Sequence, residues 1–376
     1  MEALPQRINK MNIGIIGTRG IPNRYGGFER LAEKLSVGLQ VRGHKVTVYN
    51  SHKHPYQKDK FNEVEIVHCY DAEFRLGTAG QFIYDYNCIR DANKRNFDVL
   101  LFLGYTSSSV WGKLYPRRTV IVSNMDGMEW KRKKYMPATR RFLQYAEKLA
   151  VKHSDFLIAD SPVIQTYLES KYHRLPELIA YGADTEIDME DSCLAAFDLK
   201  PSEYYLVLAR MEPENNIEMI LDGFAMSRPN KKMLVIGNTE NSLGKRLKKK
   251  YSSNTEILFA GAVFDNVVLH TLRHFSSIYF HGHTVGGTNP SLLEAMASGA
   301  LIAAHDNAFN YSILEDDAFY FSSENEVADL INADRDVEMD EAKIDNNLNK
   351  IHQQYSWPAI IAHYERYLID CVNTKN

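Results

Sequence analysis

The chain has 376 residues, of which 44% are hydrophobic and 24% charged, and its formal net charge at pH 7 is −4. This length suits two domains of about 150–200 residues with separate cores, and the slightly acidic balance argues against nucleic acid as a partner. No apolar run approaches the ~20 residues that span a bilayer, and residues 1–10 lack the apolar stretch of a secretory signal, so we expect a cytoplasmic protein.

Short apolar runs alternate with helical stretches through the first half of the chain. This alternation predicts a parallel sheet with helices on both faces. The predicted strands are residues 13–16, 46–49, 64–68, 99–103, 120–123, 156–159 and 177–180. The helices between them include residues 28–40, which Gly43 ends, and residues 81–95.

The same alternation returns after a polar segment, residues 184–203, which we interpret as a hinge. The predicted strands are residues 204–208, 233–236, 257–260, 277–280 and 301–304, and the helices are residues 217–226, 243–251, 267–275 and 289–297. The sequence therefore predicts an α/β protein with two doubly wound, Rossmann-like domains, residues 1–190 and 200–356. A last helix within residues 357–376 follows the second domain.

A glycine-rich loop follows the first predicted strand and reads GTRGIPNRYGGFER over residues 17–30. Such a loop before a helix can bind an anion, so Gly17, Arg19, Gly26 and Gly27 are candidates for a binding loop. The glycines do not fit the dinucleotide pattern GxGxxG, and Asn50 stands where an acidic residue is expected, which argues against a dehydrogenase. An ordinary turn with glycines at positive φ remains the alternative.

A second glycine-rich loop, residues 286–299, reads GGTNPSLLEAMASG and carries the strongest signal in the chain. It follows an apolar strand, and Pro in a first helical turn indicates a helix that begins near residues 289–290. Backbone amides and the helix dipole would then face an anion such as a phosphate. A carboxylate one turn further in, Glu294, can accept two hydrogen bonds from the diol of a ribose. The candidate ligand-binding residues here are Gly286, Gly287, Thr288, Asn289 and Glu294.

Three further residues follow predicted strands and are candidates for catalysis. Arg210 stands just past a strand end, where it can clamp a diphosphate, although a surface arginine fits the pattern equally well. His283 can donate to a sugar or phosphate; with His281 it gives only two ligands, so we predict no metal site. Asp126 can orient a hydroxyl group, or it is simply the turn residue before Gly127.

Residues 131–152 contain eight basic residues and one acidic residue among apolar positions at helical spacing. This pattern predicts a basic amphipathic helix that contacts anionic lipid head groups at the inner face of the cell membrane. A solvated helix face over an ordinary core is the alternative. A second basic run, residues 244–251, is interpreted as a solvated face. The four cysteines are scattered, without the spacing of metal ligands.

Taken together, these residues resemble the retaining glycosyltransferases of family 4, whose GT-B fold has two Rossmann-like domains facing each other across a cleft. The segment LLEAMASG resembles the EAMA-G signature of that family, and YGAD at residues 181–184 resembles its N-G-V-D. The resemblance implies that Glu294 holds the nucleotide ribose and Arg210 the diphosphate. It also implies that residues 286–288 face the donor sugar, that Gly26 and Gly27 line the cleft, and that the helix with Trp357 crosses back to the first domain.

Two positions depart from the family pattern. Gly286 stands where the family has the first of two glutamates, and Asn215 stands where it has a basic residue. With the segments TRGIPNRYGGFE and DGMEW, these departures resemble a bacterial rhamnosyltransferase-like branch that acts in capsule and exopolysaccharide assembly. The resemblance implies a nucleoside-diphosphate sugar such as dTDP-rhamnose as donor, a saccharide or lipid-linked acceptor, and neither a cofactor nor a metal.

We therefore expect an enzyme that moves a sugar from a nucleoside diphosphate to an acceptor hydroxyl with retention. The departing diphosphate requires charge stabilisation more than a protein nucleophile, and Arg210, His283 and helix-end amides are its candidate sources. Two alternatives remain open. One is a non-catalytic protein that binds sugar nucleotides, which the two departures favour. The other is a nucleotide-sugar 2-epimerase, which would need carboxylates to remove a proton from the sugar.

Overall fold

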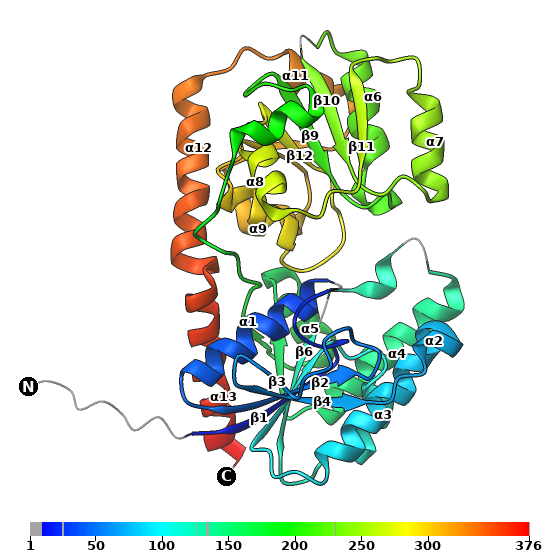
Figure 1. The fold of residues 1–376 in the computed structure, drawn as a ribbon, viewed down its shortest axis with the longest axis vertical. Helices are drawn as coiled ribbons and strands as arrows, with labels where there is room; N and C mark the ends of the chain where they lie inside the picture. Colours follow the sequence, from blue (N-terminus) through cyan, green and yellow to red (C-terminus); the bar gives the residue numbers. More distant parts are fainter. Residues whose placement is uncertain (1–9, 25, 126, 133–134, 230, 376) are drawn as a thin grey trace, which may run out of the picture. The chain divides into compact units, whose positions relative to one another are not determined.

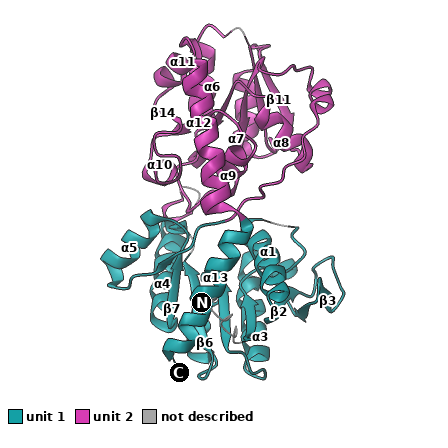
Figure 2. Cartoon of the chain, turned by 90° about the vertical axis from the view of Figure 1, so that its left-hand side faces the viewer, with its two compact units in different colours: residues 1–130, 137–181, 357–376 teal, residues 131–136, 182–356 magenta. Residues whose placement is uncertain are grey.

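The computed structural model describes residues 10–24, 26–125, 127–132, 135–229 and 231–375. It divides into two compact units, coloured teal and magenta in Figure 2. Unit 1 consists of Met1–Trp130, Pro137–Tyr181 and Trp357–Asn376, and unit 2 of Lys131–Met136 and Gly182–Ser356. Each unit contains one largely parallel sheet with helices around it (Figure 1). The predicted pair of doubly wound, Rossmann-like units is confirmed.

The sheet of unit 1 has the strand order β3-β4-β2-β1-β5-β6-β7-β8 within the described residues. All neighbouring strands in it are parallel except β3, which pairs with β4 in the antiparallel direction. All five side chains of β5 are buried, as expected for a strand covered on both faces. The strands are β1 (Asn12–Ile16), β2 (Lys45–Ser51), β3 (Lys60–Phe61), β4 (Val64–Cys69), β5 (Val99–Leu103), β6 (Val120–Met125), β7 (Phe156–Ala159) and β8 (Glu177–Leu178).

The helices of unit 1 turn an apolar stripe toward this sheet. In α1, Leu31, Leu35 and Leu39 recur every four residues and are buried, the spacing that places side chains on one helix face. The helices are α1 (Gly27–Val41), α2 (Glu73–Leu76), α3 (Gly80–Ala92), α4 (Pro137–His153), α5 (Pro162–Tyr172) and α13 (Trp357–Lys375).

The last helix, α13, packs on unit 1 next to α1. A Cβ atom at Gly38 of α1 would lie 2.5 Å from Ile361, so the glycine lets the two helices approach closely. The carboxylate of Glu365 accepts a hydrogen bond from Arg42 at 2.7 Å and lies 2.9 Å from the ring of His44. Asn124 of β6 donates to the hydroxyl of Tyr364 at 2.9 Å. These contacts make α13 part of the core of unit 1, although it follows unit 2 in the chain.

The sheet of unit 2 has the strand order β11-β10-β9-β12-β13-β14 within the described residues, and all its strands are parallel. The carboxyl ends of β9 and β12 therefore meet at one edge of the sheet. The strands are β9 (Tyr204–Leu208), β10 (Lys232–Ile236), β11 (Ile257–Gly261), β12 (Ile278–His281), β13 (Ile302–His305) and β14 (Phe319–Phe321). The helices are α6 (Ile217–Met226), α7 (Ser242–Lys250), α8 (Asn266–His274), α9 (Pro290–Ala297), α10 (Ala308–Leu314), α11 (Glu324–Asn332) and α12 (Val337–Lys350).

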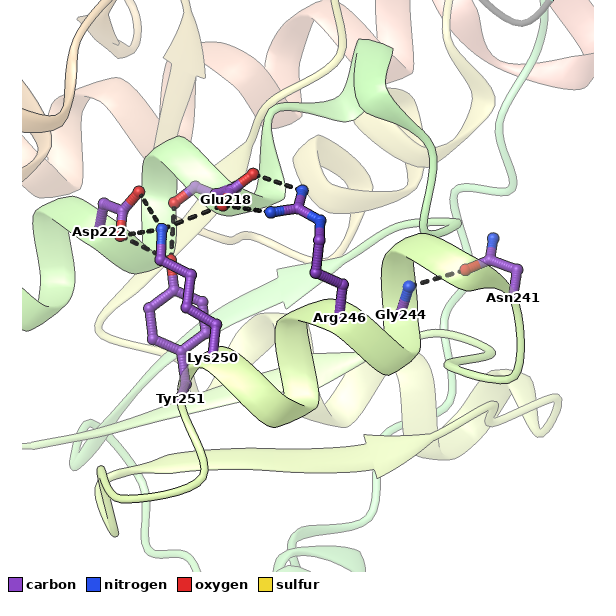
Figure 3. A network of polar contacts seen from close by, with 7 residues as sticks. All are labelled: Glu218, Asp222, Asn241, Gly244, Arg246, Lys250 and Tyr251. Atoms are coloured by element: carbon purple, nitrogen blue, oxygen red, sulfur yellow. Dashed lines mark hydrogen bonds and ion pairs between the residues drawn. The ribbon is translucent and has the colours of Figure 1, made fainter.

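The basic run at residues 244–251 forms α7 and lies beside acidic residues of α6 (Figure 3). The guanidinium of Arg246 forms two hydrogen bonds with Glu218, at 2.7 and 2.6 Å. Lys250 contacts both Glu218 and Asp222. These pairs hold the pKa of the Glu218 carboxyl down at about 2. Part of the cationic charge of α7 is therefore balanced within unit 2.

The structure differs from the sequence-based expectations in a few elements. Strands β3 and β14 were not predicted, because they are two and three residues long and lie at sheet edges. The predicted basic helix begins at Pro137, and Glu129–Lys131 forms a 3₁₀ turn before it. No helix among the described residues is long and apolar enough to cross a membrane.

Candidate active site

The glycine-rich loop of unit 2 joins β12 to α9 and has the predicted geometry. Asn289 caps α9, because its side chain accepts a hydrogen bond from the amide of Ser291 at 2.9 Å, and Pro290 occupies the first turn. Gly286 has φ +146°, and a Cβ atom there would meet nothing within 4 Å. Gly287 follows it, and the side chain of Thr288 is buried. The loop therefore has open space around Gly286 directly before a helix N-terminus.

Glu294 lies one turn into α9 and is held by a buried cation. Its Oε2 atom accepts a hydrogen bond from Nη2 of Arg273 in α8, at 2.7 Å. The side chain of Arg273 is 1% exposed, whereas that of Glu294 is 24% exposed. The same Arg273 nitrogen lies 3.3 Å from the hydroxyl of Ser291. A buried guanidinium therefore fixes the carboxylate in place while part of it still reaches solvent.

A turn after β9 carries the second group of predicted residues. Arg210 is exposed, and its carbonyl oxygen accepts a hydrogen bond from the side chain of Asn215 at 2.8 Å. Asn215 does not cap the helix that follows it. Helix α6 begins at Ile217, Asn216 occupies the cap position with φ +47°, and its side chain donates instead to the carbonyl of Gly282 at 2.8 Å. The turn is thereby fastened to the segment after β12.

His281, the last residue of β12, and His283, two residues further on, lie on the same side of the chain, as predicted. The rings of His281 and His283 stack with a centroid distance of 4.3 Å. Burial, and then the nearby cations Arg210 and Arg132, lower the pKa of His283 to about 3. Burial also lowers the pKa of His281 well below its usual value. Both rings are therefore neutral at pH 7, and His283 can serve as a neutral hydrogen-bond partner.

The glycine-rich loop of unit 1 is fixed by contacts with its own unit. Gly17 and Gly20 have φ of +103° and +124°, which fits the alternative of a turn with glycines at positive φ. The Arg19 side chain pairs with Glu73 of α2 at 2.6 Å, and the Arg19 amide donates to Glu29 at 3.1 Å. Gly26 is the residue before α1, and Gly27 is its first residue.

This loop borders a cavity of about 60 Å³ inside unit 1. Its wall is polar, and four of its ten lining residues are acidic, including Asp71, Glu73 and Asp85. Burial, together with the neighbouring Asp71, raises the pKa of Asp85 to about 7, against a hydrogen bond from Ser107 that lowers it. A space of this size admits a few water molecules or the hydroxyl groups at the edge of a sugar.

Asp126 lies outside the described residues, so its predicted role stays a prediction. Sequence reasoning missed three residues that the structure brings to attention: Arg273, Asp85 and Glu214, which lies in the turn after β9. Arg273 and Asp85 lie on helices whose pattern indicates only a buried face. Glu214 follows a strand end within a few residues, and that position was a usable signal. No group of three or more His, Cys, Asp or Glu residues that could hold a metal ion occurs among the described residues.

Comparison with known families assigns a class to this architecture. Residues 197–354 match the family model of glycosyl transferases group 1, and residues 10–184 match a domain of unknown function, DUF1972. Most of unit 2 thus matches the model of group 1 glycosyl transferases, which supports the prediction of a glycosyltransferase with a nucleotide-sugar donor. No match was found among curated proteins.

Solved structures show which particular proteins this chain is similar to. The sucrose-phosphate synthase of Thermosynechococcus elongatus has a TM-score of 0.79 at 15% identity, covering 97% of this chain and 100% of its own. The Anabaena protein Alr3699/HepE in complex with UDP and glucose has a TM-score of 0.73 at 16% identity, covering 96% and 100%. A glycosyltransferase from Rickettsia africae has a TM-score of 0.72 at 13% identity, covering 97% and 99%. These likenesses establish the GT-B fold.

Proposed function

We propose that this protein transfers a sugar, with retention, from a nucleoside diphosphate to a hydroxyl of a saccharide or lipid-linked acceptor. The observation that carries the proposal is the Glu294 carboxylate, which Arg273 fixes at 2.7 Å one turn into the helix that follows the glycine-rich loop. A fixed, partly exposed carboxylate is suited to accept hydrogen bonds from the two hydroxyls of a ribose. The amides at the start of α9 are suited to a diphosphate.

The chain's own groups would act mainly by stabilising charge on the departing diphosphate. Arg210 is exposed at the carboxyl edge of the unit 2 sheet. It lies close enough to His283 for its positive charge to lower the pKa of that histidine. A guanidinium and neutral imidazole in this position can bind phosphate oxygens as negative charge develops. The departing phosphate can itself take the acceptor proton, and Asp126 would orient the acceptor hydroxyl. This scheme requires no metal.

The donor class and the role follow from resemblance and are part of the same proposal. The Anabaena protein in complex with UDP and glucose supports a nucleotide-sugar donor. The rhamnosyltransferase-like segments favour dTDP-rhamnose as the donor, and membership of glycosyltransferase family 4, with a role in capsule or exopolysaccharide assembly. The polar cavity beside Asp85 in unit 1 is the candidate site for acceptor hydroxyls.

A panel of ligands tests the proposal. The melting temperature is measured with UDP, GDP, dTDP and ADP and with their sugar conjugates, each with and without magnesium. Saturating ligand at 100 times its Kd should stabilise the protein by about 2.7 kcal/mol. A shift for one base that Glu294→Gln reduces and magnesium leaves unchanged supports a metal-independent transferase. No shift with any nucleotide would contradict the proposed function.

A turnover assay separates the enzyme from its non-catalytic alternative. Asn215 replaces a basic residue and is engaged with the carbonyl of Arg210, so it supplies no charge to a phosphate. This observation favours a protein that binds sugar nucleotides without transferring the sugar. Release of the nucleoside diphosphate in the presence of an acceptor supports transfer. Binding without such release would favour the non-catalytic protein.

Helix α4 supports peripheral contact with an anionic membrane. Its exposed residues Arg141, Tyr145, Lys148 and Lys152 are spaced by four, three and four positions and share one helix face. The one acidic residue of the helix, Glu147, is buried and accepts hydrogen bonds from Tyr167, Lys171 and Tyr172. The exposed face is therefore cationic, with an aromatic ring at its centre, as in surface-binding helices.

Vesicle sedimentation tests this contact. Replacement of Arg141, Lys148 and Lys152 by Gln should weaken binding to vesicles with anionic lipid tenfold or more, at about 1 kcal/mol for each charge. A matched variant replaces the exposed Lys245, Lys248 and Lys249 of α7 by Gln and should bind nearly as well as the wild type. Equal binding of the wild type to neutral and anionic vesicles would exclude the electrostatic contact.

A further inference from the structure

The turn after β9 contains a glutamate, Glu214, that no predicted role explains. Glu214 lies in the 3₁₀ turn Pro213–Asn215 (η5). Its carbonyl oxygen accepts hydrogen bonds from the amide and the hydroxyl of Thr284, at 3.0 and 2.9 Å. Thr284 begins the segment that leads to Gly286. Two hydrogen bonds therefore link the backbone of Glu214 to the loop that precedes α9.

The side chain of Glu214 is buried without hydrogen bonds. The residue is 4% exposed, and neither carboxylate oxygen accepts a hydrogen bond from any residue in the described part of the chain. Nη1 of Arg132 lies 3.8 Å from Oε1, which is too far for a hydrogen bond. A buried carboxylate without hydrogen-bond donors destabilises the folded protein. Such a group is expected where a ligand supplies the donors.

The surroundings of Glu214 define the chemistry of that ligand. Arg132 and Arg210 both lower the pKa of His283, so these three side chains lie near one another, and Arg132 also lies near Glu214. The Nδ1 atom of His283 has no hydrogen-bond partner among the described residues. The two arginines suit phosphate oxygens, but a carboxylate repels phosphate and accepts hydrogen bonds from hydroxyl groups. A hydroxyl group of a ligand therefore suits Glu214 better than a phosphate does.

We propose that Glu214 binds hydroxyl groups of the transferred sugar and so helps to select the donor. The proposal rests on the proposed function, since it places the sugar of the donor beside the turn after β9. It also accounts for Gly286, which has no side chain and is surrounded by open space. A carboxylate from the neighbouring turn supplies the acceptor that this position lacks.

Comparing the affinity for a nucleoside diphosphate with the affinity for its sugar conjugate separates this role of Glu214 from a structural one. The dissociation constant is measured by calorimetry for UDP, GDP and dTDP, and for UDP-glucose, GDP-mannose and dTDP-rhamnose. Glu214→Gln should change the Kd of the bare nucleoside diphosphate less than threefold. One of the sugar conjugates should bind the wild type more tightly than its bare nucleoside diphosphate does. Glu214→Gln should raise the Kd of that conjugate about 10–100-fold, as expected for the loss of a hydrogen bond to a charged group.

Controls exclude a loss of folding. Glu212→Gln changes a neighbouring, partly exposed glutamate of the same turn and should leave both dissociation constants unchanged. The melting temperature of the unliganded Glu214→Gln variant should equal or exceed that of the wild type, because a buried charge without donors is removed. A fall in melting temperature with equal weakening of both ligands would show that Glu214 only pairs with Arg132, and would overturn the proposal.

The remaining outcomes are also decisive. If Glu214→Gln leaves the sugar conjugate as tightly bound as in the wild type, Glu214 does not contact the sugar. If the wild type binds a nucleoside diphosphate but gains no affinity from any sugar, the role of Glu214 is overturned while nucleotide binding stands. If the wild type binds no nucleoside diphosphate at all, the proposed function fails first, and this role fails with it.

Discussion

The two glycine-rich loops of the molecule share a position, after a parallel strand and before a helix, but are held differently. In unit 1, a Cβ atom at Gly20 would lie 2.3 Å from the side chain of Asn50, and Arg19 pairs with Glu73. In unit 2, a Cβ atom at Gly286 would meet nothing, and Glu214 beside the loop lacks donors in the part of the chain described. The two loops therefore differ although their glycine patterns are similar. The loop of unit 1 is held by contacts with its own unit, whereas the carboxylate beside the loop of unit 2 has no hydrogen-bond donor among the described residues.

The largest expected effect is on nucleotide binding and comes from comparing Glu294→Ala in unit 2 with Glu29→Ala in unit 1. Glu294→Ala should lower nucleotide affinity and kcat/KM about 100-fold, because two hydrogen bonds to a charged group are lost. It should also reduce stability by about 3–5 kcal/mol, since the buried Arg273 loses its partner. Glu29→Ala in the loop of unit 1 should leave nucleotide affinity unchanged. The measurements are calorimetric titration and urea unfolding, and activity of Glu294→Ala within tenfold of wild type would refute the assignment.

The second prediction compares how much stability is lost when Gly20 and Gly286 are each replaced by alanine. Gly20→Ala should reduce the free energy of unfolding by about 2–5 kcal/mol, because it combines backbone strain with a clash against Asn50. Gly286→Ala should reduce it by about 1–2 kcal/mol, because only strain at φ +146° applies. Urea unfolding of both variants measures the difference. Equal losses would show that the loop of unit 2 is as closely packed as that of unit 1.

A pH-dependent effect is expected next to the loop of unit 1. The pKa of Asp85 rises from 3.8 to about 7 on folding, so the folded protein holds a proton that the unfolded chain releases between pH 4 and 7. The free energy of unfolding therefore falls as pH rises through this window, by at most about 4 kcal/mol from this group. Asp85→Asn should remove the fall and be the more stable protein at pH 8.

The test of Asp85 is the difference between the two proteins. Other titrating groups cancel in it, so urea unfolding of wild type and Asp85→Asn at pH 4.5, 6 and 8 suffices. The advantage of the variant should grow with pH. A difference that stays constant from pH 4.5 to 8 would mean that Asp85 titrates near its usual value.

The smallest expected effect concerns the ion pair in the loop of unit 1. The side chains of Arg19 and Glu73 are 35% and 26% exposed, and solvent screens such pairs. Arg19→Gln should therefore cost less than about 1 kcal/mol of stability. If the loop of unit 1 only supports the fold, nucleotide affinity should also stay unchanged. A tenfold loss of affinity would instead assign Arg19 to the donor.

The fold and much of the site could be predicted because they depend on local patterns. Strands β5, β7 and β9 and helix α6 have the predicted bounds, since buried parallel strands are continuous apolar runs. The start of α9 at Pro290 follows from the same local rules. The short edge strands β3 and β14 have too few residues to show a pattern.

The pairing of side chains could not be predicted, because it depends on distant segments. Arg273 and Glu294 are 21 residues apart and meet only because α8 and α9 pack together. The two basic runs show the same limit. Arg246 and Lys250 of α7 pair with acidic residues of α6. Helix α4 instead buries its one acidic residue and leaves Arg141, Lys148 and Lys152 exposed. Composition alone does not distinguish these two helices.

The place of α13 has a consequence for how the chain folds during synthesis. The residues that complete unit 1, Trp357–Asn376, are made after Gly182–Ser356 of unit 2. Domains usually fold in order of emergence from the ribosome. Three contacts of unit 1 form only after α13 has been made. They join Gly38 to Ile361, His44 to Glu365 and Asn124 to Tyr364. Translation of unit 1 thus begins before that of unit 2, but unit 1 is completed only after unit 2.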